Sequence, residues 1–349
     1  MRYLSLFTGI GGFELGIKKA YDAIPRICEH EGGSQENSDI HVNHSELPQG
    51  GRQWGSPVCI GYSEIDKYAI EIYKKHFPNH ENYGDITKID ERELPDFDLL
   101  VGGFPCQSFS IAGKRGGFGD TRGTLFFDIA RIVREKQPRL LCLENVKGLL
   151  SHDEGRTFAT IIGTLDELGY DLEWQVLNSK NHGVPQNRER IFIVGHLRGT
   201  GRTKVFPFWE SHRGPEETCD PSRKKVANTV RAKLGGPDLE NSYFIPIPEA
   251  TKKGYAEARP GQSINLAVLG SKTRRGRVSD IAQTIDTGMQ QHTIAKGGGI
   301  RRLTPRECER LQGFPDDWTE GISDTQRYKC IGNAVTVNVI RDIFDRIMK

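Results

Sequence analysis

The chain contains 349 residues, 27% charged and 36% hydrophobic, the composition of an ordinary globular protein with one large domain or two. No apolar run approaches the ~20 residues of a membrane span, and the N-terminus does not resemble a signal peptide, so we expect a cytoplasmic protein. Seven scattered cysteines include no C-x-x-C pair, which indicates neither a zinc site nor a disulfide framework.

The net charge of +2 conceals an asymmetry along the chain. Residues 1–195 contain 22 Lys and Arg against 28 Asp and Glu, whereas residues 196–349 contain 26 against 18. This division favours a polyanion-binding region beside a catalytic one. A solvated basic face explains the charge equally well.

The chain begins with a pattern that is typical of a ligand-binding loop. An expected strand, 2–7, leads into a glycine turn, 8–12 (TGIGG), and a helix over about 13–21. This layout can hold a nucleotide-like ligand at a helix N-terminus, although a simple tight turn is the alternative. The nicotinamide fingerprint needs a third glycine where this chain has Glu14, and a carboxylate beside the loop favours a cationic or neutral cofactor over a pyrophosphate.

A second expected strand, 58–63, follows a polar stretch, 30–57, that we interpret as a surface insertion. The strand ends at Glu64, Ile65 and Asp66, before a helix over 67–76. A carboxylate at this position can accept both hydroxyls of a ribose. A charge that stabilises the helix N-terminus explains Asp66 as well.

A third expected strand, 97–101, leads through Gly102, Gly103, Phe104 and Pro105 to Cys106. A cysteine on such a stiff turn lies outside the core, and a basic, glycine-rich stretch, 111–123, follows it. The thiol is therefore either reactive or a structural cysteine on a tight turn.

A helix, 124–136, and a fourth expected strand, 139–143, precede Glu144. A partly dry site would raise the pKa of this carboxyl and make it a general acid, while a capping or ion-paired glutamate is the alternative. An amphipathic helix, 155–169, and strands 171–177 and 191–195 follow. Gln186, Arg188 and Arg190 occupy alternate positions just before the last strand. On an extended backbone such side chains point the same way, so both guanidiniums could face one acidic target.

In the predicted open α/β sheet, the candidate site residues lie at the same edge. Gly9, Glu64, Cys106 and Glu144 each follow a different strand, and ligands bind at the carboxyl edge of such sheets. From about residue 197 the alternation of expected strands and helices stops. Residues 199–300 contain short extended segments and no expected helix. Its most basic run, 272–277 (KTRRGR), suits phosphates or forms a solvated loop. Residues 301–318 and 328–340 are expected to be ordered again.

Six motifs in this order resemble those of the DNA cytosine-5 methyltransferases of bacterial restriction-modification systems. They are FTGIGG (7–12), GFPCQSFS (103–110), ENVKG (144–148), QNRER (186–190), RRLTPRECERLQGFP (301–315) and YKCIGNAV (328–335). The resemblance implies a doubly wound, mostly parallel α/β sheet of the Rossmann-like methyltransferase type, formed by 1–198 plus 328–349. It assigns 199–327 to a smaller, irregular, β-rich target-recognition domain and hinge.

The resemblance also implies the chemistry. Cys106 would attack carbon 6 of cytosine as a thiolate, and Glu144 would hold the base by ring nitrogen 3 and its amino group. Supporting roles fall to Asn145, which orients Glu144 and the Pro105 turn, and to Arg190, supported by Arg188. The cofactor would be S-adenosylmethionine, bound by Phe7, Gly9, Gly11, Glu64, Ile65, Asp85 and Asn333.

The implied substrate is double-stranded DNA, from which the target base must be flipped out. The loop from Ser110 to Gly123 would close over that base with Arg122 on phosphate, and Thr284 resembles a recurring threonine of the recognition domain. We expect a monomer whose partner is a restriction endonuclease acting on the same DNA sequence. Three alternatives are a tRNA cytosine-5 methyltransferase, a nicotinamide-dependent oxidoreductase and a DNA-binding protein without catalysis.

Overall fold

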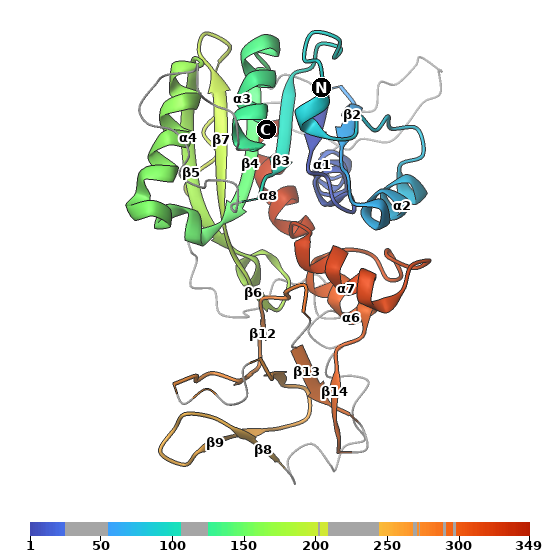
Figure 1. The fold of residues 1–349 in the computed structure, drawn as a ribbon, viewed down its shortest axis with the longest axis vertical. Helices are drawn as coiled ribbons and strands as arrows, with labels where there is room; N and C mark the ends of the chain where they lie inside the picture. Colours follow the sequence, from blue (N-terminus) through green and yellow to red (C-terminus); the bar gives the residue numbers. More distant parts are fainter. Residues whose placement is uncertain are drawn as a thin grey trace, which may run out of the picture.

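The computed structural model describes residues 1–24, 55–105, 125–201, 203–208, 244–267, 271, 273–288, 291–295 and 298–349. Its largest element is a six-stranded sheet with the order β2-β1-β3-β4-β7-β5 (Figure 1). The strands are β1 (Arg2–Leu6), β2 (Val58–Ser63), β3 (Leu99–Gly103), β4 (Leu140–Val146), β5 (Tyr170–Asn178) and β7 (Glu189–Leu197). The first four strands in chain order are parallel, whereas β7 is antiparallel to both its neighbours.

Helices cover both faces of this sheet, because successive apolar side chains along its strands point to opposite faces and both faces must be buried. Leu4, Leu100 and Leu141 point to one face, where α3 (Leu125–Lys136) and α4 (Arg156–Glu167) pack. Tyr3, Leu99 and Cys142 point to the other, where α1 (Gly12–Asp22) lies against α8 (Val337–Met348). The doubly wound, mostly parallel α/β sheet is therefore confirmed.

The ends of several strands differ from those that local sequence predicts. The third strand begins and ends two residues later than 97–101, and the fourth continues to Val146 instead of ending at residue 143. Glycine and glutamate are poor strand formers, so local propensity places the ends too early. In the folded chain Gly103 pairs with Glu144 across the parallel ladder. Glu144 thus lies inside a strand.

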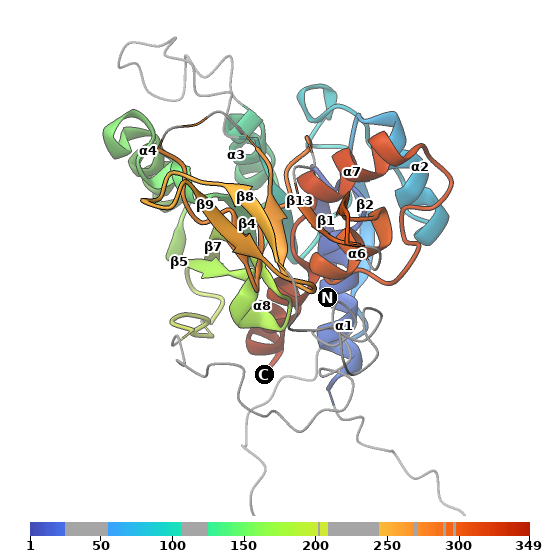
Figure 2. The same ribbon diagram turned by 90° about the horizontal axis from the view of Figure 1, so that it is seen from below.

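A second, smaller β unit follows the large sheet along the chain. A hairpin joins β8 (Ile245–Pro248) to β9 (Tyr255–Ala258), and a four-stranded sheet contains β10 (Ser263–Asn265), β11 (Val278–Ser279), β13 (Gln291–Ile294) and β14 (Ile300–Arg302). Its core is small: Ile247, Ala258, Ile264 and Ile294. Figure 1 shows this unit beyond one end of the large sheet, and in Figure 2 β8 and β9 lie nearest the viewer. The expected β-rich second unit is confirmed.

Between the two units lie α6 (Pro305–Leu311), α7 (Asp324–Asn333) and the short parallel pair β6 (Gln186–Asn187) and β12 (Ala282–Gln283). The two helices share a hydrophobic core with α2 (Lys67–His76) and with Ile10 and Leu15. The expected domain boundary at 328 falls within α7. Residues 203–208 pack on the large sheet, since Glu173 accepts hydrogen bonds from the backbone N–H groups of Val205 and Phe206.

Short 3-10 helices complete the connections: η1 (Ile86–Lys88), η4 (Lys147–Leu150), η5 (His152–Gly155) and η6 (Ser179–His182). Among the helices of the described ranges, none has the length and apolar character that a membrane span requires.

Candidate active site

An ion pair between Glu144 and Arg190 lies near the ends of the central strands. Glu144 Oε1 is 3.0 Å from Arg190 Nε, and the side chains are only 13% and 17% exposed. Antiparallel pairing places Arg190 opposite Val146, so the arginine and Glu144 are diagonal neighbours on one face. On the other side, a Cβ at Gly103 would lie 3.0 Å from Glu144 Oε2, so a glycine keeps space for the carboxylate.

The surroundings of Glu144 shift its protonation as expected. Burial raises the pKa of Glu144, while the charges of Arg190 and Arg188 act in the opposite direction. Burial is the stronger effect. The carboxyl group can therefore hold a proton at a higher pH than an exposed glutamate.

Asn145 joins the end of β4 to the turn that leads toward Cys106. Its Nδ2 donates to the carbonyl of Phe104 at 2.9 Å, and its Oδ1 accepts from the backbone N–H of Val146 at 2.8 Å. The side chain is 3% exposed, so this geometry is held in a dry environment. The backbone before Pro105 is thereby fixed beside Glu144. Cys106 follows directly and, like Ser110 and Arg122, lies outside the described residues.

Arg188 points to a different target from Arg190. Its guanidinium is buried and donates to the carbonyls of Ile285, Gly332 and Ala334 at 3.1, 3.1 and 2.9 Å. Burial lowers the pKa of Arg188 to about 9. The expectation that both guanidiniums face one acidic group is thus wrong for Arg188. The extended backbone is interrupted between β6 and β7, where the N–H of Arg188 donates to the carbonyl of Gln186.

The glycine loop and the end of β2 meet at the same edge of the sheet. Gly9 and Gly11 adopt positive φ angles of 58° and 88°, as does Phe7 at 53°. The N–H of Gly9 donates to Glu64 Oε2 at 2.9 Å, and the N–H groups of Ile65 and Asp66 donate to Oε1, each at 2.8 Å. Glu64 therefore uses three of the roughly four acceptor sites of a carboxylate.

Two further predicted cofactor residues lie at or beside this edge. Ile65 is 72% exposed, an unusual position for a large aliphatic side chain. Asp85 follows Gly84, whose carbonyl accepts from Ser63 Oγ at 2.7 Å, and Asp85 Oδ1 caps η1 through Thr87. The last, Asn333, is the exposed C-terminal residue of α7. These groups fit an adenosine-bearing cofactor, since they offer an apolar surface, carboxylate acceptors and open space above Gly9.

Three residues have surroundings that differ from the expectation or that local sequence did not reveal. Glu14 is 2% exposed and accepts from Tyr73 Oη at 3.1 Å, so its charge does not face the glycine loop. Arg277, in the basic run, is buried and donates to the carbonyls of Asn265 and Ala267 instead of facing phosphates. Trp318, which no motif singled out, donates from Nε1 to the carbonyl of Ile10 at 2.9 Å.

Thr284 lies at the junction of the two β units. Its hydroxyl donates to the carbonyl of Asn187 at 2.8 Å, and the next N–H, of Ile285, donates to Gln186 Oε1 at 3.0 Å. The threonine thus anchors the segment after β12 to β6.

A family model described as C-5 cytosine-specific DNA methylase matches residues 1–349. The chain therefore belongs to this family and is a DNA (cytosine-5-)-methyltransferase, as its motifs predicted.

Curated relatives and solved structures agree with this assignment. The chain is 41% identical to the type II methyltransferase M1.ScrFI of Lactococcus lactis subsp. cremoris over 82% of this chain and 71% of that protein. It is 35% identical to M.HhaI of Haemophilus parahaemolyticus over 98% and 93% of the two chains. The S. pombe Dnmt2 methyltransferase structure has a TM-score of 0.62 at 18% identity, over 99% of this chain and 97% of that chain, which shows a shared fold.

Proposed function

We propose that this enzyme transfers a methyl group from S-adenosylmethionine to carbon 5 of a flipped-out cytosine in a specific sequence of double-stranded DNA. The observation that carries the proposal is the buried pair of Glu144 and Arg190, beside the Phe104–Pro105 turn that leads directly to Cys106. A general acid, a cation and a cysteine at one sheet edge are what activation of this base requires.

Carbon 5 of cytosine is a poor nucleophile, so the ring must first gain electron density. The Cys106 thiolate bonds to carbon 6, and Glu144 donates a proton or hydrogen bond at ring nitrogen 3 as negative charge develops there. Arg190 holds Glu144 and lies near the carbonyl of the base. After carbon 5 accepts the methyl group, it loses its proton, the bond between carbon 6 and sulfur breaks, and Cys106 is released.

S-adenosylmethionine supplies an electrophilic methyl group on a sulfonium centre. The glycine loop, Glu64, Ile65 and Asp85 would hold it, with the ribose on Glu64 and the adenine on Ile65. Because Glu64 has about one acceptor site left, binding both ribose hydroxyls requires it to release a backbone N–H. We assign Asn333 and Phe7 to the same pocket.

The family and the type II methyltransferase relatives support DNA over tRNA as the substrate and a place in a restriction-modification system. Flipping the base costs a few kcal/mol, which backbone contacts must offset. We assign these backbone contacts to Arg122 and Ser110, and the choice of DNA sequence to the recognition unit that contains Thr284. We propose that the enzyme acts as a monomer. A hydride-transferring oxidoreductase is disfavoured by Glu14 in place of the third glycine.

The test of this proposal is Cys106→Ser, with Cys59→Ser as the matched control at a cysteine on the edge strand β2. Tritium transfer from labelled S-adenosylmethionine should disappear in the first variant and persist in the second, while DNA binding persists in both. Full activity of Cys106→Ser would overturn the mechanism. Bisulfite sequencing of DNA from cells that express the protein would give the base, its position and its context together.

A further inference from the structure

The indole of Trp318 connects the loop between α6 and α7 to the glycine loop, 308 residues earlier in the chain. Its Nε1 donates to the carbonyl of Ile10 at 2.9 Å, and the side chain is 7% exposed. A hydrogen bond in such a dry place is costly to lose, because the carbonyl would remain buried without its donor. Ile10 itself is fully buried between the glycines that shape the loop.

Trp318 is held rigidly on its other side by α2. The His76 ring stacks on the indole at 3.5 Å between centroids with an interplanar angle of 6°, and His76 Nε2 donates to the Trp318 carbonyl at 2.8 Å. Phe77 also contacts the indole edge-on, and a Cβ at Gly11 would lie 2.5 Å from Phe77. The glycine loop therefore rests on an aromatic cluster formed by Trp318, His76 and Phe77.

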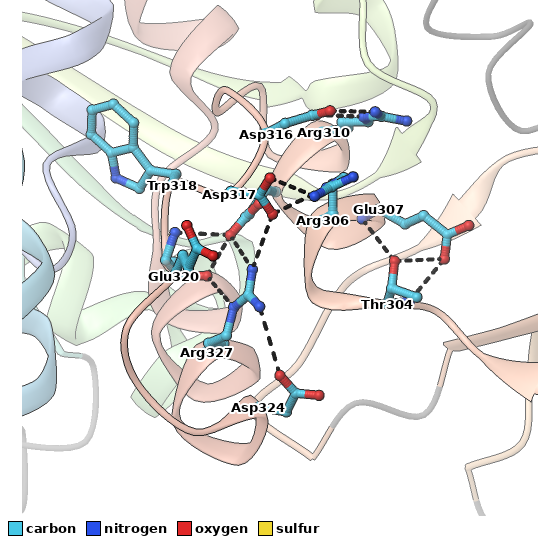
Figure 3. Close-up of polar contacts among 12 residues, drawn as sticks. Thr304, Arg306, Glu307, Arg310, Asp316, Asp317, Trp318, Glu320, Asp324 and Arg327 are labelled. Carbon is cyan, nitrogen blue, oxygen red and sulfur yellow. Dashed lines mark hydrogen bonds and ion pairs between the residues drawn. The ribbon is translucent and has the colours of Figure 1, made fainter.

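A polar network fixes the position of the loop that carries Trp318 (Figure 3). Arg327 donates to Glu309 at 3.1 Å and to Thr319 at 2.9 Å, and the N–H of Thr319 also donates to Glu309 at 2.9 Å. Arg306 pairs with Asp317 on the same loop. In Figure 3 the indole points away from this network, so the charged groups hold the backbone and leave the ring to contact the glycine loop.

We propose that Trp318 is a positioning residue for cofactor binding, which acts by holding the carbonyl of Ile10 and with it the backbone of residues 9–12. Gly9, whose N–H is bonded to Glu64, is then kept in the conformation that leaves open space above it. The inference rests on the proposed use of S-adenosylmethionine. It also links the cofactor loop to the helices that follow the recognition unit, since α7 contacts the same edge through Lys329 and Asp66, 2.6 Å apart.

The test is Trp318→Phe, which keeps a six-membered aromatic ring for the stack and removes the N–H donor together with the five-membered ring of the indole. Calorimetric titration with S-adenosylhomocysteine should show binding weakened by about 5- to 10-fold, the effect of losing one buried hydrogen bond. The KM for S-adenosylmethionine should rise by a similar factor, while kcat at saturating cofactor and the KM for DNA stay within about twofold. The matched control is Trp174→Phe, at a tryptophan 46% exposed on the edge strand β5, and it should bind like the wild type.

The outcomes separate this inference from the proposed function. If the wild type does not bind S-adenosylhomocysteine, the cofactor proposal fails. If the wild type binds and Trp318→Phe binds equally well, the cofactor stands and the positioning role is wrong. If Trp318→Phe lacks a cooperative thermal transition and is therefore not folded, His76→Gln takes its place in the test. This substitution removes the stacked ring and keeps a donor for the Trp318 carbonyl. That variant should bind about 2- to 5-fold more weakly, and unchanged binding would then overturn the inference.

Discussion

Glu144 is surrounded by residues from the two strands beside β4. Gly103 on β3 leaves room for the carboxylate, and Arg190 on β7 pairs with it at 3.0 Å. Burial raises its pKa, although both arginines oppose that shift. The result is an acid that is held in position and is readier to keep its proton than a glutamate at the surface.

Replacing this acid by its amide tests its role at the reacting base. In Glu144→Gln we expect methyl transfer to slow by ~100-fold or more, because an amide cannot donate a proton, while the fold persists. Single-turnover transfer of tritium would measure the rate. The control Glu189→Gln, at an exposed glutamate paired with Lys147, should react at the normal rate. A near-normal rate in Glu144→Gln would exclude Glu144 from the reaction.

Glu14 makes the stability of the protein depend on pH. Burial raises the pKa of Glu14 to about 7, and one of its oxygens has no partner among the described residues. The native state thus holds this proton more tightly than the unfolded chain, so the resulting stability is present below pH ~4 and is lost as pH rises through 7. Nearby Tyr3, Cys59 and Tyr73 stay neutral in this range because burial raises each pKa.

The variant Glu14→Gln, which is neutral at every pH, should remove that loss. Relative to wild type, we expect it to gain up to about 3 kcal/mol in the free energy of unfolding between pH 5 and pH 8, at 1.36 kcal/mol per pKa unit. Urea unfolding at several pH values measures the difference. Glu71→Gln, at an exposed position of α2, should follow the wild-type curve. Parallel curves for Glu14→Gln and wild type would contradict the prediction.

At the scale of elements, Arg188 joins segments that local patterns assigned to different units. Its guanidinium binds carbonyls of Ile285, in the segment after β12, and of Gly332 and Ala334, at the end of α7. Gln186 extends this junction by donating to the carbonyl of Leu311 at 2.9 Å. The segment after β12 and the ends of α6 and α7 are thus attached to β6 and its neighbour by the side chains of Gln186 and Arg188.

Arg188→Lys should weaken this junction. A lysine has no planar fork and cannot reach all three carbonyls, so we expect a loss of about 2–4 kcal/mol in the free energy of unfolding. Chemical denaturation would measure it. Arg198→Lys, at an exposed arginine paired with Asp166 and Asp171, should leave the stability close to that of the wild type. Equal stabilities of the two variants would show that the junction does not depend on the guanidinium.

At the scale of the whole molecule, the two β units divide the proposed tasks of chemistry and sequence choice. Residues 203–208 nevertheless belong with the large sheet, because Val205 and Phe206 are buried against it and bonded to Glu173. The division between the units therefore lies after residue 208. Residues 303–323 share a hydrophobic core with α2, and α6 is also joined to the small sheet, because Arg301 of β14 donates to Glu307 at 2.8 and 2.7 Å.

Exchanging residues 209–300 for the counterpart of another family member should move the methylated site while methyl transfer continues. An exchange that starts at residue 199 should lose stability as well, since it removes the contacts of Val205 and Phe206 with the core. Bisulfite sequencing reads the site and thermal unfolding the stability. An unchanged site after the first exchange would show that sequence choice lies elsewhere.

The sequence by itself determined the class of the protein and most of its sheet. Short apolar runs predict the strands, the stretch after Asp66 predicts α2 at its observed bounds, and ordered motifs point to the family. These signals are local, because apolar patterns and helix capping involve residues a few positions apart. Only the tertiary structure decided the extension of β4 through Glu144, the separation of Arg188 from Arg190 and the contact of Trp318 with Ile10. These features depend on contacts between residues more than 40 positions apart: Gly103 with Glu144, Arg188 with Ile285, and Trp318 with Ile10. The free energy of such a contact is set by which surfaces the fold brings together.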